Sequence, residues 1–279
     1  MPVSTPLLSI DNLRKSFGGV QAVGGVSFDV RLGQLVALIG ANGAGKTTTF
    51  NCINGQLRPD GGKVLYNPAA LTTEERIRLE KEGELEKFET PHPHDITYSL
   101  PRRISRLGIG RTFQITATFS SMTVRENVQM VLIAQRKLWK RLWGFAGKMF
   151  CDEAMALLDT VGLGAQAERH TATLAYGDLK RLELAMALAN NPKLLLMDEP
   201  TAGMGVEERD TIMRLAHGIA KKQNIGILFT EHDMDAVFNY ADWIIVLHRG
   251  EVIARGNTAS IKSHPQVREV YLGKDNQDA

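Results

Sequence analysis

Cysteine is scarce in this chain. Of 279 residues only Cys52 and Cys151 are cysteines, and this pair forms neither a disulfide framework nor the closely spaced ligand set of a zinc site. We therefore expect a protein of a reducing compartment.

The sequence also lacks long apolar runs. Runs such as 194–197 and 243–247 have the length of strands, far below the ~20 apolar residues that cross a bilayer. The first six residues carry neither the positive charge nor the apolar stretch of a secretory signal. The sequence therefore predicts a chain that does not itself cross a membrane.

An excess of charge of one sign is missing too. The chain has 33 Lys and Arg residues against 31 Asp and Glu residues, a net charge of +2, and no basic run. Nucleic acid is therefore not expected as a partner. With 43% hydrophobic and 23% charged residues, the chain can bury the core of one large domain or of one domain with lobes.

What the sequence does contain is a glycine-rich phosphate-binding loop at 40–47, Gly-Ala-Asn-Gly-Ala-Gly-Lys-Thr. It follows the apolar run 35–39, which is typical of a buried parallel strand, and a helix is expected to start near Lys46. The glycines allow a sharp turn that presents N–H groups to phosphates, the lysine reaches the β and γ oxygens, and the threonine hydroxyl can ligate Mg²⁺. The loop predicts a nucleoside-triphosphate site with these candidate contacts: Gly40, Asn42, Gly43, Gly45, Lys46 and Thr47.

An acidic pair follows a second apolar run. Residues 193–197 are typical of a buried strand, and Asp198 and Glu199 come directly after it. A carboxylate at the carboxyl edge of an open α/β sheet suits Mg²⁺, so Asp198 is a candidate metal ligand. Glu199 would then lie beside the γ-phosphate as the general base that orients and deprotonates water.

The remaining pattern predicts a small antiparallel layer against a parallel α/β core that is interrupted by a helical lobe. Short β-like runs at 8–13, 26–30 and 63–66 predict a small antiparallel layer. Helical spacing begins at Thr123, where Thr-Val-Arg-Glu forms a capping box, and a second helix is expected over 148–161. After Leu174 an alternation typical of a parallel α/β core predicts helices at 177–189 and 206–222 and strands at 194–197 and 225–230.

Four further motifs complete a pattern that resembles an ABC-type ATPase over essentially the whole chain. The segment 174–178, Leu-Ala-Tyr-Gly-Asp, looks like the family's signature loop at the start of a helix, and 111–114, Arg-Thr-Phe-Gln, resembles its glutamine loop. The segment 230–233, Thr-Glu-His-Asp, resembles its switch-histidine loop, and Phe17 matches the aromatic residue that stacks on adenine. The resemblance implies an α/β P-loop NTPase fold with a RecA-like core, an antiparallel β subdomain and a helical subdomain.

It also implies a single ABC ATPase domain over 1–279. The expected parts are the antiparallel β layer with the phosphate loop at 7–66, a charged insertion at 67–100, the helical subdomain at 115–175, the rest of the core at 176–256 and a C-terminal helix or tail at 257–279. The role of the insertion stays open.

By the same resemblance the cofactors are ATP and Mg²⁺. Thr48 would hold the α-phosphate, Gln114 would touch Mg²⁺ and the attacking water, and His232 would hydrogen-bond the γ-phosphate and orient Glu199. The signature loop would act on ATP held by a second ATPase subunit, through Ala175, Tyr176 and Gly177.

Two departures from the common family pattern indicate one branch. Ala175 and Tyr176 stand where Ser and Gly are usual, so a hydroxyl donor to the partner's γ-phosphate is missing, and Gly205 stands where many members carry an aspartate. Together with 51–55, Asn-Cys-Ile-Asn-Gly, and 270–273, Val-Tyr-Leu-Gly, they resemble the ATP-binding subunits of branched-chain (hydrophobic) amino-acid importers.

That branch implies a peripheral protein on the cytoplasmic face of the inner or plasma membrane. Its expected partners are a second, different ATPase subunit, two transmembrane permease subunits and, indirectly, a periplasmic or extracellular substrate-binding protein. Two alternatives stay open: the ATPase of a lipid or lipopolysaccharide exporter, and a soluble ABC ATPase outside transport. The cargo also stays open among leucine-like amino acids, urea, amides and aromatic acids, because an ATPase subunit never touches it.

One other stretch is unusual. Residues 138–145, Leu-Trp-Lys-Arg-Leu-Trp-Gly-Phe, interleave aromatic and basic side chains around Trp139 and Trp143. This pattern suits contact with a partner protein or a bilayer surface, and it equally suits packing inside the helical subdomain.

Overall fold

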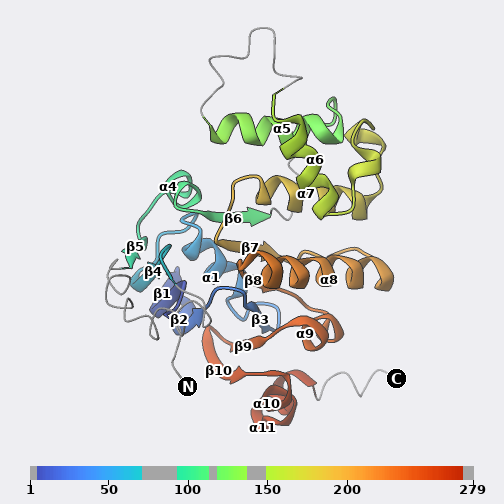
Figure 1. Ribbon diagram of the computed structural model, residues 1–279. Coiled ribbons are helices and arrows are strands. Elements are labelled where there is room, and N and C mark those ends of the chain that lie inside the picture. The colour runs from blue at the N-terminus through green and yellow to red at the C-terminus, as the bar shows by residue number, and fades with distance from the viewer. Residues whose placement is uncertain (1–4, 71–92, 113–117, 137–148, 273–279) are drawn as a thin grey trace, which may run out of the picture.

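The computed structural model describes residues 5–70, 93–112, 118–136 and 149–272. It contains two β-sheets with a group of helices above them (Figure 1). The strands are β1 (Leu8–Phe17), β2 (Val20–Val30), β3 (Leu35–Gly40), β4 (Gly61–Tyr66), β5 (His94–Asp95), β6 (Ile109–Thr112), β7 (Leu194–Asp198), β8 (Gly226–Thr230), β9 (Trp243–His248) and β10 (Glu251–Gly256). The α-helices are α1 (Lys46–Ile53), α4 (Pro101–Arg106), α5 (Val124–Gln135), α6 (Cys151–Thr160), α7 (Tyr176–Leu188), α8 (Val206–Gln223), α9 (Met234–Tyr240), α10 (Thr258–Ser263) and α11 (Pro265–Val267). Among the helices formed by these residues, none is long and apolar enough to cross a bilayer.

The smaller sheet has the order β2-β1-β4-β5 and is antiparallel, as expected. The prediction for its first two strands was too short, because β1 has 10 residues and β2 has 11. Gly18 and Gly19, with φ values of 50° and 87°, form the turn between them. Pairing continues beyond the apolar runs, through exposed residues such as Arg14 and Gln21, because ladder hydrogen bonds join backbone groups and do not require apolar side chains. His94 and Asp95, expected in the charged insertion, form β5 at the edge of this sheet.

The larger sheet has the order β10-β9-β3-β8-β7-β6, and all neighbours are parallel except β9 and β10. β3, β7 and β8 are buried along their whole length, which explains their continuous apolar sequences. The strands expected at 194–197 and 225–230 are confirmed to within one residue at their ends.

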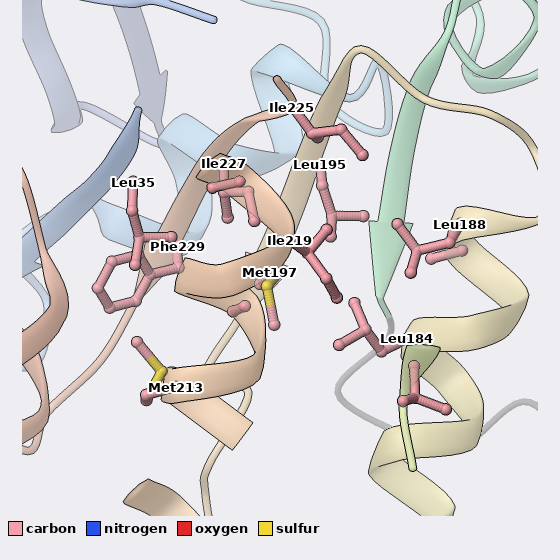
Figure 2. Close-up of a cluster of buried hydrophobic side chains, with 14 of the residues drawn as sticks. Leu35, Leu184, Leu188, Leu195, Met197, Met213, Ile219, Ile225, Ile227 and Phe229 are labelled. Carbon is pink, nitrogen blue, oxygen red and sulfur yellow. The ribbon is translucent and has the colours of Figure 1, made fainter. Parts of the chain in front are cut away.

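Alternate residues of β3 enter two hydrophobic cores. Leu35, Ala37 and Ile39 belong to a core that includes residues of α7 and α8, while Val36 and Leu38 belong to a core that includes α1 and the antiparallel sheet. Figure 2 shows the first core, where side chains of β3, β7 and β8 lie beside those of α7 and α8. Since full burial of one large aliphatic side chain contributes roughly 1.5–3 kcal/mol, these cores hold the strands in a fixed register.

This strand order brings the carboxyl ends of β3, β8 and β7 to one edge of the sheet. Asp198 at the end of β7 is the register partner of Thr230 at the end of β8. On its other side Thr230 pairs with Leu38 of β3, two residues before Gly40. Open α/β sheets bind ligands at this edge, so the fold places the phosphate loop close to the acidic pair.

The helices α5, α6 and α7 pack against one another in the upper part of Figure 1. The predicted capping box is confirmed: the Glu126 N–H donates to Thr123 Oγ1 (3.2 Å), and the Thr123 N–H donates to Glu126 Oε2 (2.8 Å). The helix expected over 148–161 corresponds to α6, and α7 begins one residue before the expected Gly177.

Candidate active site

The phosphate loop connects β3 to α1, and its glycines are required by the backbone. Gly40, Gly43 and Gly45 have φ values of 158°, 80° and 102°. A Cβ on Gly40 would lie 2.4 Å from the Leu247 carbonyl oxygen, and one on Gly45 would lie 2.4 Å from the Ala22 carbonyl oxygen. A Cβ on Gly43 would have no neighbour within 4 Å. The loop is therefore packed tightly on its inner side and open at Gly43, as a cradle for phosphate groups must be.

The first turn of α1 adds backbone donors to this cradle. The N–H groups of Lys46, Thr47 and Thr48 lie in that turn, where no intrahelical acceptor exists for them. The Thr49 N–H and hydroxyl both bond the Gly45 carbonyl oxygen, each at 2.9 Å, which fixes the junction of loop and helix. The side chains of Asn42 and Thr47 are exposed beside it. A helix N-terminus of this kind attracts anions.

Lys46 is 6% exposed and folds back over the loop. Its Nζ donates to the carbonyl oxygens of Gly40 (2.7 Å) and Ala41 (3.2 Å). Burial lowers the pKa of this ammonium group, while the negative charges of Glu199 and Asp198 raise it. The cation therefore lies between the loop and the acidic pair, where phosphate oxygens would be stronger acceptors than the carbonyls it now contacts.

Asp198 is held by two neighbouring strands. The side chain is 5% exposed, and its Oδ1 accepts a hydrogen bond from Thr230 Oγ1 (2.7 Å). Its Oδ2 lies 3.5 Å from Arg111 Nη2 at the end of β6, and Arg111 Nη1 donates to Gln56 Oε1 (2.6 Å). Burial lowers the pKa of the Arg111 guanidinium, and the Asp198 charge raises it. The carboxylate is thus fixed in place beside the phosphate loop.

Glu199 and His232 form a direct pair. Glu199 Oε1 lies 2.9 Å from His232 Nε2, and both side chains are partly accessible, at 24% and 44%. Glu199 has a φ of 48°, a left-handed conformation that non-glycine residues rarely adopt, and its N–H donates to Thr230 Oγ1 (3.0 Å). A carboxylate oriented by a histidine at the edge of a phosphate site has the geometry of a general base.

The signature residues lie at the start of α7. Ala175 is the N-cap residue and offers no side-chain hydrogen bond, Tyr176 is exposed, and Gly177 is buried. A Cβ on Gly177 would lie 3.1 Å from Glu208 Oε1 of α8, so a larger residue would have to displace that side chain. Ala175 and Tyr176 are both exposed, so this helix start is accessible to another molecule.

Of the other predicted site residues, the structure describes Phe17 but not Gln114. Phe17 ends β1 with 46% of its surface exposed, and Lys15 Nζ lies 5.4 Å from its ring centroid. Gln114, the Trp139 and Trp143 stretch and residues 71–92 of the insertion lie outside the described residues.

For three residues of this site the sequence had predicted no role. Thr230 and Glu231 belong to the switch-histidine motif, and Arg111 belongs to the glutamine-loop motif, but no role was expected for them. For Thr230 and Glu231 the signal was a polar side chain at the end of an apolar strand, which at this edge of a parallel sheet faces the ligand. Arg111 had no such signal, because β6 is not an apolar run.

The phosphate loop, the acidic pair, the switch histidine and the separate helical lobe define an ATPase of the ABC class. The sequence profile of the ABC transporter family matches residues 23–202, and that of the branched-chain amino acid ATP-binding cassette transporter matches residues 251–276. The chain belongs to the ABC transporter family and is one of its ATP-binding ATPases. Such subunits work with membrane permeases and associate with the membrane peripherally. The predicted fold class and family are confirmed.

Relatives of this chain include ATP-binding proteins of branched-chain amino acid transport. The chain is 36% identical to the high-affinity branched-chain amino acid transport ATP-binding protein LivG of Salmonella typhimurium, over 98% of this chain and 100% of the relative. It is 34% identical to the corresponding BraF of Pseudomonas aeruginosa, with the same coverage. Among solved structures, the ADP conformation of MJ1267, an ATP-binding cassette of an ABC transporter, is similar with a TM-score of 0.78 and 30% identity, covering 96% of this chain and 99% of that one.

Proposed function

We propose that this chain hydrolyses MgATP to energise an importer of branched-chain or other hydrophobic amino acids. The observation that carries the hydrolysis mechanism is the Glu199 and His232 pair, held at the sheet edge where the phosphate loop begins. The similarity to LivG and BraF supports the cargo class.

The residues present fit a magnesium ion. Asp198 offers a buried carboxylate at the strand end, and the Thr47 hydroxyl is exposed in the first turn of α1. These two residues, with Gln114, would hold Mg²⁺, which commonly takes one or two protein oxygens together with substrate phosphates. When bound, the ion would neutralise charge on the β- and γ-phosphates.

The chain's own residues then divide the work on ATP. The ring of Phe17 stacks on the adenine, and the loop N–H groups of Gly43 and Gly45, with the neighbouring Gly40 and Asn42, surround the phosphates. Lys46 exchanges its carbonyl acceptors for β and γ oxygens, and Thr48 holds the α-phosphate. This arrangement binds ATP without performing the chemistry.

Hydrolysis depends on the acidic pair and the switch histidine. Glu199 orients a water molecule for in-line attack on the γ-phosphate and accepts its proton. His232 holds the Glu199 carboxylate through Nε2 and hydrogen-bonds the γ-phosphate, while Gln114 positions the water. The bond between the γ-phosphorus and the bridging oxygen breaks, and ADP and phosphate are released.

The signature loop acts on a second ATPase subunit. Ala175, Tyr176 and Gly177 present the N-terminus of α7 to ATP held by that partner, while the partner's signature completes the site of this chain. The expected assembly is a heterodimer with two permease subunits, supplied by a substrate-binding protein and placed on the cytoplasmic face of the membrane. A groove of about 830 Å³ lies beside α4 and α5, and its lining includes Arg102, Arg106 and Lys193.

Unequal sites are the consequence for activity. A hydrogen bond from a signature hydroxyl to a charged phosphate is worth about 1.5–3 kcal/mol, and Ala175 cannot make it. We expect Ala175→Ser to raise the ATPase rate of the assembled transporter severalfold. Ala172→Ser, at an exposed position three residues earlier, should leave the rate unchanged.

A serine at position 175 would also cap α7, so the melting temperature must be measured beside the rate. A higher melting temperature with an unchanged rate would contradict the asymmetric site. So would a homodimer of this chain that fully supports transport.

The cargo is tested in proteoliposomes that contain the chain, its permeases and its partner ATPase. A leucine-loaded binding protein should stimulate ATP hydrolysis severalfold, whereas the same protein with urea or an amide should not. Stimulation by a lipid or lipopolysaccharide without any binding protein would indicate an exporter instead. The measurement is the rate of phosphate release at saturating ATP.

A further inference from the structure

We propose that Glu231 is a positioning residue that holds Glu199 and His232 together, an inference that rests on the proposed function. Glu231 follows the five buried, mostly apolar residues of β8. It is itself only 4% exposed, although it carries a carboxylate. A buried carboxylate is costly unless hydrogen bonds compensate it. Its partners therefore indicate what it does.

Both oxygens of Glu231 are used, and they reach two different loops. Oε1 accepts hydrogen bonds from the Thr201 N–H (2.9 Å) and from Thr201 Oγ1 (2.5 Å), and Thr201 is itself 2% exposed. Oε2 accepts a hydrogen bond from the His232 N–H (3.1 Å). One carboxylate thus joins Thr201, in the loop that follows Glu199, to His232, whose side chain contacts Glu199.

The backbone of Glu199 is held by hydrogen bonds of the residues on both sides of it. Its left-handed backbone conformation is unfavourable for a residue with a side chain, so the surroundings must hold it. On one side, Thr230 Oγ1 accepts from the Glu199 N–H and donates to Asp198. On the other side, Thr201 is held by Glu231.

A second link reinforces the same junction. Asp233 caps α9 through Oδ1, which accepts from the N–H groups of Asp235 (2.9 Å) and Ala236 (3.1 Å), and its Oδ2 pairs with Arg209 of α8. The segment from Glu199 to Arg209 and the switch loop are therefore joined at two places outside the catalytic pair. This segment also contains Gly203 and Glu208, which lie near Tyr176 and Gly177 of the signature loop.

The test is Glu231→Gln in the assembled transporter. An amide has one acceptor oxygen, so its NH₂ group would face either the Thr201 donors or the His232 N–H, and one loop would be released. We expect kcat to fall about tenfold, with KM for ATP and ATP binding by the full chain changed less than about twofold. Glu251→Gln, an exposed carboxylate on β10, is the matched control and should behave as the wild type.

Thr201 provides an independent variant if Glu231→Gln folds poorly. Thr201→Ser keeps the hydroxyl donor and should retain wild-type kcat, whereas Thr201→Val removes it and should lower kcat about threefold at unchanged KM. In a Glu199→Gln background, Glu231→Gln should lower the residual rate by less than about twofold, because residues that act through one group are not additive.

The outcomes separate this role from the proposed function. If Glu199→Gln retains turnover, the proposed general base fails and the positioning role fails with it. If Glu199→Gln is inactive but Glu231→Gln and Thr201→Val hydrolyse ATP at the wild-type rate, only the positioning role is overturned. Parallel losses of kcat, ATP binding and melting temperature in both variants would likewise overturn it in favour of a purely structural role.

Discussion

Replacing Glu199 by Gln should lower ATP turnover by about a hundredfold or more, because the amide cannot accept the proton of the attacking water. The change preserves size and leaves the phosphate loop untouched, so ATP affinity should stay within about twofold of the wild type. The measurement compares the steady-state rate of phosphate release with the equilibrium binding of ATP.

Two features of the structure sharpen this expectation. Glu199 is anchored through its N–H to Thr230 (3.0 Å), so the backbone of the variant should keep its conformation. The side chain still reaches His232, since either nitrogen or oxygen of the amide can pair with an imidazole. Glu153→Gln, an exposed carboxylate on α6, is the control for the change of charge. A Glu199→Gln variant that retains near-normal turnover would remove Glu199 from the mechanism.

Replacing Lys46 by Ala should instead weaken ATP binding, by about 10- to 100-fold, because charge-assisted hydrogen bonds to the β and γ oxygens are lost. The ammonium lies beside both the loop carbonyls and the acidic pair, so its removal also takes one nearby positive charge away from Asp198 and Glu199, although Arg111 still lies 3.5 Å from Asp198. Binding titrations of the full chain with ATP measure the effect.

Lys222→Ala, at an exposed position in the last turn of α8, is the matched control for this change. It should bind ATP like the wild type. An unchanged ATP affinity of Lys46→Ala would contradict the assigned role. The melting temperature of Lys46→Ala is also measured at high ATP concentration. Because ligand binding stabilises the folded state by mass action, a rise to the wild-type value would show that the variant folds and binds ATP, only more weakly.

Comparison of the two variants separates binding from chemistry. Lys46→Ala should mainly raise the dissociation constant for ATP, and Glu199→Gln should mainly lower kcat. The structure supports this separation because Lys46 is the first residue of α1, whereas Glu199 follows β7 and is held by residues of β8 and the switch loop.

The local elements of the site could be predicted from the sequence because short segments determine them. Glycines with positive φ shape the phosphate loop whatever surrounds it, and the Thr123 capping box needs only four consecutive residues. Continuous apolar runs indicated β3, β7 and β8, since a strand buried on both faces has no polar alternation.

Some elements were missed because their own residues do not determine them. β6, with the sequence Ile-Gly-Arg-Thr, is a strand because it pairs with β7, and β10 is a strand because it pairs with β9. The outer halves of β1 and β2 are likewise paired at exposed positions. Backbone pairing of this kind depends on a neighbour that lies far along the chain.

The sequence by itself determined the type of chemistry: a loop that binds phosphates, a carboxylate pair after a strand and a histidine after another. Only the tertiary structure decided which side chains hold them. Thr230 contacts Asp198 because β7 and β8 are parallel neighbours in one register, and Glu231 reaches Thr201 across the same two strand ends, 30 positions away in sequence. Sheet order and register set these contacts, and both result from packing of the two cores rather than from any local run of residues.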